Sequence, residues 1–185
     1  MRSLICILCI SVLLVGCSGK NTDMDRALAL RSKLFSQAVS FDAEITADYG
    51  SSAVSFVLGC SLDSSGTLVF SVKEPKTLSG IAGNISAKGG KLTFDDKAVA
   101  FELLADGEVS PISGPWILMQ TLRSGYLTSC AKEGQYLRLS IDDSYEDDAL
   151  HLDIWLNDAD APVRAEIIWQ GRRILSMSVS NFTFV

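Results

Sequence analysis

Alternating apolar and polar positions dominate the chain from residue 41 onward. Phe41, Ala43 and Ile45 alternate with Asp42 and Glu44, which is the pattern of a strand with one dry face and one wet face. The same period of two returns in later segments, separated by short turns rich in Gly, Asp, Asn or Ser, as in antiparallel hairpins. The pattern predicts about nine or ten strands.

Two segments depart from this period and predict helices. Residues 23–38 place Met24, Ala27, Leu34 and other apolar residues at helical spacing, so we expect an amphipathic helix there. Residues 116–122 are apolar almost all round and follow a Pro/Gly-rich break, which predicts a second, short helix.

The predicted sheet is too broad to lie flat. Nine strands about 4.8 Å apart span roughly 43 Å, whereas two helices about 10 Å wide cover only about half of that width. We therefore expect an α+β, mainly β fold, in which a curled antiparallel sheet forms an incomplete barrel around the helices. Either side chains or a ligand fill the hollow, and the short helix is either a lid across its mouth or a buried core helix. The residues expected to line the hollow are Ile45, Phe56, Phe70, Phe101, Trp116, Met119, Ile154 and Ile167.

The first residues have the layout of an export signal. Arg2 precedes an apolar run that ends at Val15, and a helix of about 12 residues, about 18 Å long, is too short to cross a bilayer core of roughly 30 Å. Leu14, Val15, Gly16 and Cys17 resemble the lipobox of bacterial prolipoproteins, in which the cysteine receives diacylglycerol, with palmitate-type chains, before cleavage. The alternative is a standard secretory signal with a cysteine near its cleavage site. We expect a signal peptide over 1–16, a lipidated tether over 17–23 and one domain over 24–185.

Charge and cysteine content narrow the function classes. The formal charge is −6, and loss of Arg2 with the leader leaves 15 basic against 22 acidic residues, which disfavours nucleic acid and anionic lipid surfaces as partners. Of the cysteines outside the leader and the lipobox, Cys60 and Cys130 remain. They form either a disulfide or, at the apolar strand position of Cys60, a buried free thiol.

No arrangement in the sequence predicts catalysis, a metal or a cofactor. His151 is the only histidine and is out of phase with its apolar neighbours, so we expect it on the wet face. The acidic run over 142–148 does not match calcium-loop spacing and is interpreted as a solvated hairpin loop. Trp155 and Tyr136 also fall on the wet face, either as a partner contact or as scattered exposed aromatics.

The order of elements and two groups of short motifs resemble the LolA/LolB superfamily of lipoprotein carriers and receptors. The opening helix and first strand are similar at 31–34 and 40–43, and the closing strands at 160–166, 171–174 and 181–182. The resemblance implies a hydrophobic cavity, under a half-open barrel, that accepts acyl chains or another amphiphile. Soluble carriers of that superfamily have an arginine after a proline in the first barrel strands, whereas Pro75 is followed by Lys76, Thr77 and Leu78. A fixed acceptor, scaffold or sensor therefore fits better than a shuttle.

The expected function is binding of a lipid, acyl chain or acylated protein in the apolar cavity, without catalysis. The alternative is an envelope interaction lipoprotein with a packed barrel that docks a protein partner. The protein is expected on the cell membrane, or on the outer membrane of a Gram-negative cell. The sequence does not indicate an oligomeric state.

Overall fold

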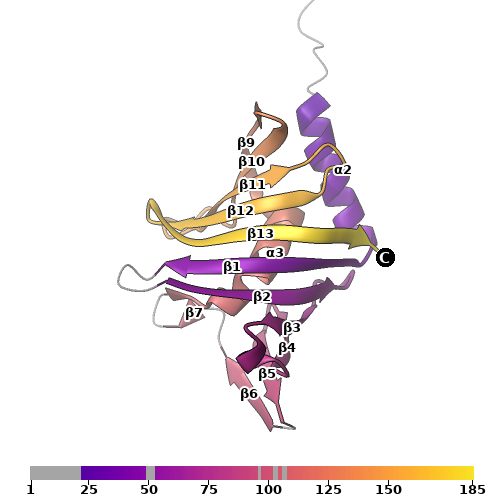
Figure 1. The fold of residues 1–185 in the computed structure, drawn as a ribbon. Coiled ribbons are helices and arrows are strands. Elements are labelled where there is room, and N and C mark those ends of the chain that lie inside the picture. The colour runs from indigo at the N-terminus through magenta and orange to yellow at the C-terminus, as the bar shows by residue number, and fades with distance from the viewer. Residues whose placement is uncertain (1–21, 49–52, 96, 102–103, 106–107) are drawn as a thin grey trace, which may run out of the picture.

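An eleven-stranded antiparallel sheet with two helices forms the body of the protein (Figure 1). The computed structural model describes residues 22–48, 53–95, 97–101, 104–105 and 108–185. The elements are α2 (Thr22–Ser36), β1 (Val39–Asp48), β2 (Ala53–Leu62), β3 (Leu68–Glu74), η1 (Lys76–Leu78), β4 (Ala82–Ser86), β5 (Gly89–Phe94), β6 (Lys97–Phe101), β7 (Leu104–Ala105), β8 (Glu108–Val109), η2 (Pro111–Ser113), α3 (Gly114–Ser124), β9 (Tyr126–Glu133), β10 (Tyr136–Asp142), β11 (His151–Leu156), β12 (Pro162–Trp169) and β13 (Arg172–Phe184).

The sheet is an open structure, as predicted. Its strand order is β6-β5-β4-β3-β2-β1-β13-β12-β11-β10-β9, so β6 and β9 are the two ends and do not pair with each other. Every neighbouring pair is antiparallel. In the middle of the sheet, the last strand in the chain, β13, pairs with the first strand, β1. The prediction of a curled antiparallel sheet that forms an incomplete barrel is confirmed.

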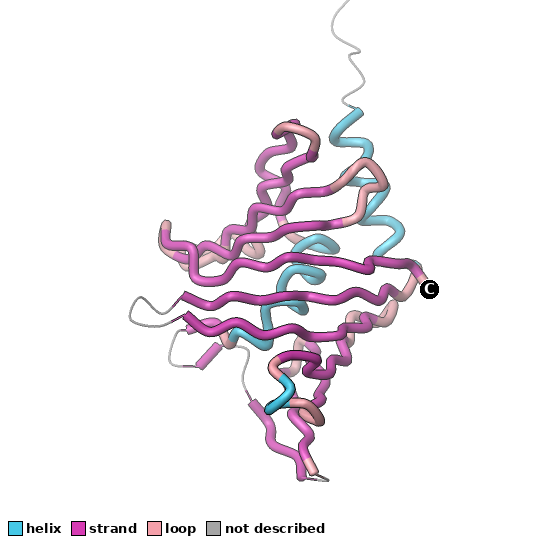
Figure 2. The backbone as a smooth tube through the Cα atoms, in the orientation of Figure 1, coloured by secondary structure: helices cyan, strands magenta, loops and turns pink. Residues whose placement is uncertain are grey.

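The helix α3 lies against the middle of the sheet, behind β13, β1 and β2 in the view of Figures 1 and 2. It contacts both β2 and β10, which are five steps apart in the strand order. Five steps span about 24 Å in a flat sheet, whereas an 11-residue helix is only about 16 Å long. The sheet therefore curls around α3, and the apolar side chains of its concave face pack on this helix.

The dry face predicted from the alternation is the core. Phe41, Ala43, Ile45 and Ala47 of β1 are at most 2% exposed, while Asp42 and Thr46 between them reach the outer, convex face. The first helix starts and ends within two residues of its predicted bounds and buries Ala27, Leu30 and Leu34 against the core. Neither helix in the described ranges has the length and apolar character needed to span a bilayer.

The short helix is a fixed core helix. Trp116 Nε1 of this helix donates a hydrogen bond to the Gly66 carbonyl at 2.9 Å, and Arg123 Nη2 donates to the Ser64 carbonyl at 2.7 Å. Arg31 of α2 donates to the carbonyls of Leu122 and Gly125, both at 2.9 Å. A cation that binds the last carbonyls of a helix satisfies them and is favoured by the helix dipole. The predicted alternative of a buried core helix therefore describes α3 better than a lid.

Candidate functional site

The hollow predicted from the sequence is occupied by packed side chains. Of the eight residues expected to line it, six are at most 8% exposed in the core, namely Ile45, Phe70, Trp116, Met119, Ile154 and Ile167. The other two, Phe56 and Phe101, are partly buried and pack against the same cluster. Contact of any of these residues with a ligand stays a prediction.

A pocket of about 330 Å³ opens at the end of the β12–β13 hairpin, and we call it the mouth pocket. Its volume is at the lower end of the roughly 300–1,000 Å³ that small-molecule sites occupy. Four apolar residues and three polar residues line it, namely Val109, Trp169, Ile174, Leu175, Asp48, Gln170 and Arg172.

The hairpin turn positions the lining of the mouth pocket. Gln170 and Gly171 both have positive φ, 49° and 76°, which suits a two-residue turn whose twist matches the flanking strands. The turn pairs Trp169 with Arg172, and a register shift between Ile167 and Ile168 of β12 changes the strand alternation there. As a result, apolar and polar side chains lie together at this end of the half-barrel.

The polar residues of the mouth pocket lie at the hairpin turn and at the end of β1. Arg172 Nη2 donates a hydrogen bond to the carbonyl of Asp48 at 3.1 Å, which ties the start of β13 to the end of β1. Apolar side chains with a few convergent polar groups are the usual composition of a small-molecule site. This arrangement suits a molecule with an apolar part and a polar end.

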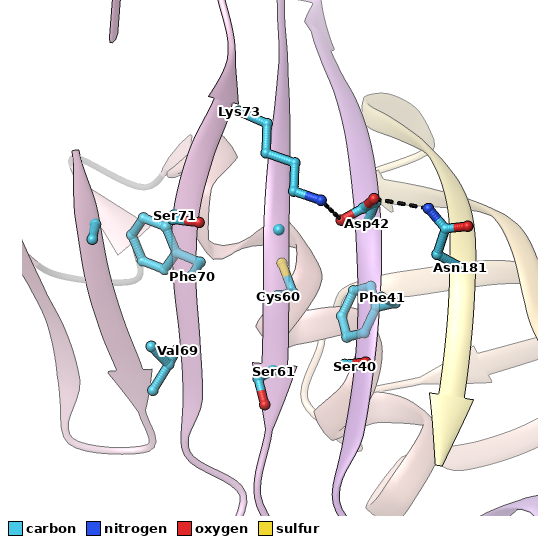
Figure 3. A pocket seen from close by; sticks show the side chains of 12 residues that line it. Ser40, Phe41, Asp42, Cys60, Ser61, Val69, Phe70, Ser71, Lys73 and Asn181 are labelled. Carbon is cyan, nitrogen blue, oxygen red and sulfur yellow. Dashed lines mark hydrogen bonds and ion pairs between the residues drawn. The ribbon is translucent and has the colours of Figure 1, made fainter. Parts of the chain in front are cut away.

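A second depression, about 560 Å³ in volume, lies on the convex face, and we call it the outer groove (Figure 3). Its central floor is Gly59 in the middle of β2. A Cβ at this position would lie 2.7 Å from Cε of Lys73, so the bare glycine gives the Lys73 side chain room to cross β2. The side chains that reach the groove from the convex face include Ser40, Asp42, Ser61, Val69, Ser71, Lys73 and Asn181.

Asp42 is the centre of the polar contacts in the outer groove. It accepts a hydrogen bond from Lys73 Nζ at 2.5 Å and another from Asn181 Nδ2 at 2.9 Å, drawn as dashed lines in Figure 3. Asn181 has φ of 53° and lies beside a bulge in the β1–β13 pairing, which turns its amide toward Asp42. Burial raises the pKa of Asp42, but the two donors and the Lys73 charge outweigh burial and lower it overall.

A network of charged side chains covers the convex face farther along the sheet. Asp153 is 5% exposed and accepts hydrogen bonds from Arg138 at 2.6 and 3.1 Å and from the Ser140 hydroxyl at 2.7 Å. His151 lies on this face as predicted, with Nδ1 2.7 Å from Asp142 Oδ1 and Nε2 3.5 Å from Asp153 Oδ1. Since the Ser140 hydroxyl donates to a carboxylate that Arg138 already holds, the arrangement is an ion-pair network and not a nucleophile with its base.

The prediction that Trp155 is an exposed aromatic residue or a partner contact on the wet face is wrong. Trp155 lies on the convex side but is only 7% exposed, because the guanidinium groups of Arg138 and Arg164 lie 5.5 and 4.5 Å from its ring centroid. Neither sequence alternative, a partner contact or an exposed aromatic, describes it. Tyr136 is half-buried.

The disulfide alternative for Cys60 and Cys130 is wrong, because both thiols are free. Cys60 lies on β2 and Cys130 on β9, with five strands between them in the sheet. Cys60 is buried, and burial raises the pKa of its thiol far above the ordinary value, so it stays protonated. The alternative of a buried free cysteine is confirmed for Cys60.

The lipobox residues Leu14, Val15 and Gly16 and the acylation site Cys17 lie outside the described residues. Within the ranges that the structure describes, no group of three or more His, Cys, Asp or Glu side chains is arranged to hold a metal ion.

Neither the mouth pocket nor the outer groove was predicted from the sequence. The mouth pocket combines the β12–β13 hairpin with Val109 of β8 and Asp48 of β1, which are far apart in the chain. One feature of the sequence could have indicated the outer groove. Gly59 is at a wet-face position in the interior of β2, where a glycine commonly marks the close approach of another group.

No protein-family model and no curated protein matches the sequence. Similar solved structures include an uncharacterized conserved protein from Thermus thermophilus, with 11% identity, a TM-score of 0.49 and coverage of 88% of this chain and 87% of that one. A LolA superfamily protein from Nitrosomonas europaea has 8% identity, a TM-score of 0.43 and coverage of 86% and 93%. The lipoprotein LppX of Mycobacterium tuberculosis has 12% identity, a TM-score of 0.43 and coverage of 87% and 93%. A LolA superfamily protein, the group that the sequence motifs resemble, is therefore among the similar structures, and this likeness concerns the fold alone.

The contacts of Asp42 predict how its titration depends on Lys73. In a Lys73→Met variant the pKa of Asp42 rises, because burial still raises it while one donor and one positive charge are lost. Carboxyl carbon NMR across the acid range measures this change. Asp63 is the internal control, since its pKa is lowered by Ser65 and the Thr67 amide and should not move.

The same pair predicts a dependence of stability on pH. A carboxyl with a lowered folded-state pKa stabilises the fold above its unfolded pKa of about 3.9, and this contribution is lost as pH falls through the lowered value. The wild type should therefore be more stable than Lys73→Met near neutral pH, and the two should converge in acid. An Asp42 that titrates identically in both proteins would contradict this account.

Proposed function

We propose that this protein is a membrane-anchored bacterial lipoprotein that binds the apolar part of an amphiphile, such as a lipid or an acylated protein, without catalysis. The observation that carries the proposal is the mouth pocket, where Val109, Trp169, Ile174 and Leu175 offer apolar surface beside the polar side chains of Gln170 and Arg172. The hydrophobic effect favours entry of an acyl chain, and the polar residues can bind its head group.

The mouth pocket is also adjacent to a residue that was predicted from the sequence to line the cavity. Leu175 lines the pocket and pairs across the strands with Ile167 on one side and Ala47 on the other. Leu175 is 2% exposed and Ile167 is fully buried, so a chain that entered farther would displace packed side chains. Shallow binding at the mouth therefore costs less than filling the barrel.

The membrane anchor is proposed from Leu14 to Cys17. Two or more acyl chains on one cysteine hold a protein on a membrane far longer than a single chain, since each buried methylene contributes about 0.8 kcal/mol. The first described helix begins at Thr22, so residues 18–21 would join the acylated cysteine to the domain. An anchored protein fits an acceptor or sensor that stays in the envelope.

One observation favours a second candidate function. The concave face is filled by α3 and its neighbours, and a packed interior is what an interaction lipoprotein that docks a protein partner would have. In that case the mouth pocket would be incidental, and substitutions within it would leave partner binding unchanged. Uptake of an amphiphile separates the two candidates.

The anchor predicts the location of a Cys17→Ala variant. Without the acylated thiol the protein should leave the membrane fraction and should no longer incorporate an alkyne-labelled palmitate analogue, as click labelling would detect. Cys130→Ala is the matched control, because that half-buried thiol lies outside the lipobox and should not affect labelling. Equal labelling of the wild type and Cys17→Ala would contradict the anchor.

The mouth pocket predicts the effect of a polar side chain in its lining. Ile174→Gln should weaken binding of a fluorescent fatty acid by about tenfold, since burying an amide without a partner costs about 1–3 kcal/mol and 1.4 kcal/mol is one decade. Ile168→Gln is the control, because Ile168 is also half-buried but does not line the pocket. Equal weakening by both variants, or no uptake by the wild type, would contradict the proposal.

A further inference from the structure

The outer groove runs across the strands of the sheet and not along them. Its lining comes from five neighbouring strands, in the order β13, β1, β2, β3 and β4. Four strand spacings of about 4.8 Å give a length of about 19 Å. The groove can therefore hold a short linear molecule laid across the convex face.

An occupant of this groove must be bound by side chains. The backbone amides and carbonyls of its central strands, β1, β2 and β3, are used in the sheet ladders on both sides. Addition of a peptide strand requires a free sheet edge parallel to the peptide, which the groove does not offer. The polar side-chain groups that face it are the hydroxyls of Ser40, Ser61 and Ser71 and the charged and amide groups of Asp42, Lys73 and Asn181. Of the hydroxyls, Ser40 Oγ also lies 3.0 Å from Thr183 Oγ1.

These side chains supply donors and acceptors in similar measure. Each serine hydroxyl and the Asn181 amide can do both, while Asp42 accepts and Lys73 donates. Asp42 and Lys73 neutralise each other at 2.5 Å, so the groove has no uncompensated charge from this pair to select an anion or a cation. A ligand with many neutral hydroxyl or amide groups fits this chemistry best.

The surface of the groove is low and partly apolar. Ala82 has a small side chain and the Lys73 side chain lies over Gly59, while Val69, two residues before Ser71 on β3, is 54% exposed. A sugar ring has hydroxyls at its edge and C–H groups on its faces, so one ring of an oligosaccharide can contact Val69 while hydroxyls of its other rings reach the serines and Asn181. An acyl chain would displace water from the serine hydroxyls without replacing its hydrogen bonds, which is costly.

We propose that the outer groove is a binding site for a neutral oligosaccharide. The site is separate from the mouth pocket, because its side chains alternate with the core residues of the same strands and so face the opposite side of the sheet. Sugar binding here is independent of amphiphile binding there, and failure of either leaves the other standing.

The test is titration of the mature domain with chitotetraose and with maltotetraose, followed by amide NMR. At least one of the two should shift the amides of 40–42, 59–61, 71–73 and 181, and leave those around Trp169 and Arg172 unchanged. Laurate is a third probe and should give the opposite pattern under the proposed function. No shift in the groove with either sugar, or shifts there with laurate alone, would overturn the proposal.

Two variants assign the binding to the groove. Ser71→Trp fills it from an exposed position and should weaken sugar binding at least tenfold, whereas Ser55→Trp, exposed on the same face of β2 but outside the groove, should not. Asn181→Gly removes the amide at a positive φ that glycine adopts freely, and should also weaken binding. Amide spectra of all three variants check the fold, and unchanged affinity in both Ser71→Trp and Asn181→Gly would overturn the proposal.

Discussion

Packing of the apolar concave face on α3 is the constraint on which the rest of the structure depends. The sheet presents more dry surface than a flat layer could hide, so it curls until one short helix covers its middle. That helix is then held at fixed points, because Trp116 and Arg123 bind the β2–β3 turn and Arg31 of α2 binds the carbonyls at its end. Withdrawal of α3 would break these hydrogen bonds and expose the core at the same time, so the helix acts as part of the core. The mouth pocket and the outer groove lie away from it, at the end of the β12–β13 hairpin and on the convex face.

The two sites differ in chemistry because successive side chains of a strand face opposite sides of the sheet. Along β1, residues that face inward join the core and residues that face outward meet water, and Asp42 of the outer groove directly follows Phe41 of the core. The mouth pocket offers apolar surface beside a few polar side chains, while the outer groove offers hydroxyls and an internally compensated ion pair. One sheet can thus present an amphiphile site at its end and a polar site on its back without either disturbing the packing between them.

The parts of the fold that follow from local periodicity could be predicted, and the parts that depend on tertiary contacts could not. The alternation over 41–47 and the helical spacing over 24–34 each reflect one buried face, so they are visible in sequence. The edge strand β9 was missed because Leu127 and Cys130 are its only half-buried residues and do not alternate. Trp155 was misread because two arginines from neighbouring strands cover it, and the mouth pocket was not predicted because a bulge and a distant segment build it. Gly59 was a readable sign of the outer groove, but its meaning depends on Lys73 crossing from the next strand.

The central claim is that α3 occupies the hollow of the half-barrel and leaves the mouth pocket as the place for an acyl chain. Crystals of the mature domain grown with a terminally brominated fatty acid test this claim most directly. Anomalous scattering locates the bromine even where the rest of the fatty acid is not visible in the electron density. The account predicts bromine density beside Val109, Trp169 and Ile174, with α3 unmoved. Bromine density between α3 and the sheet, against Ile45, Met119 and Ile154, would contradict it.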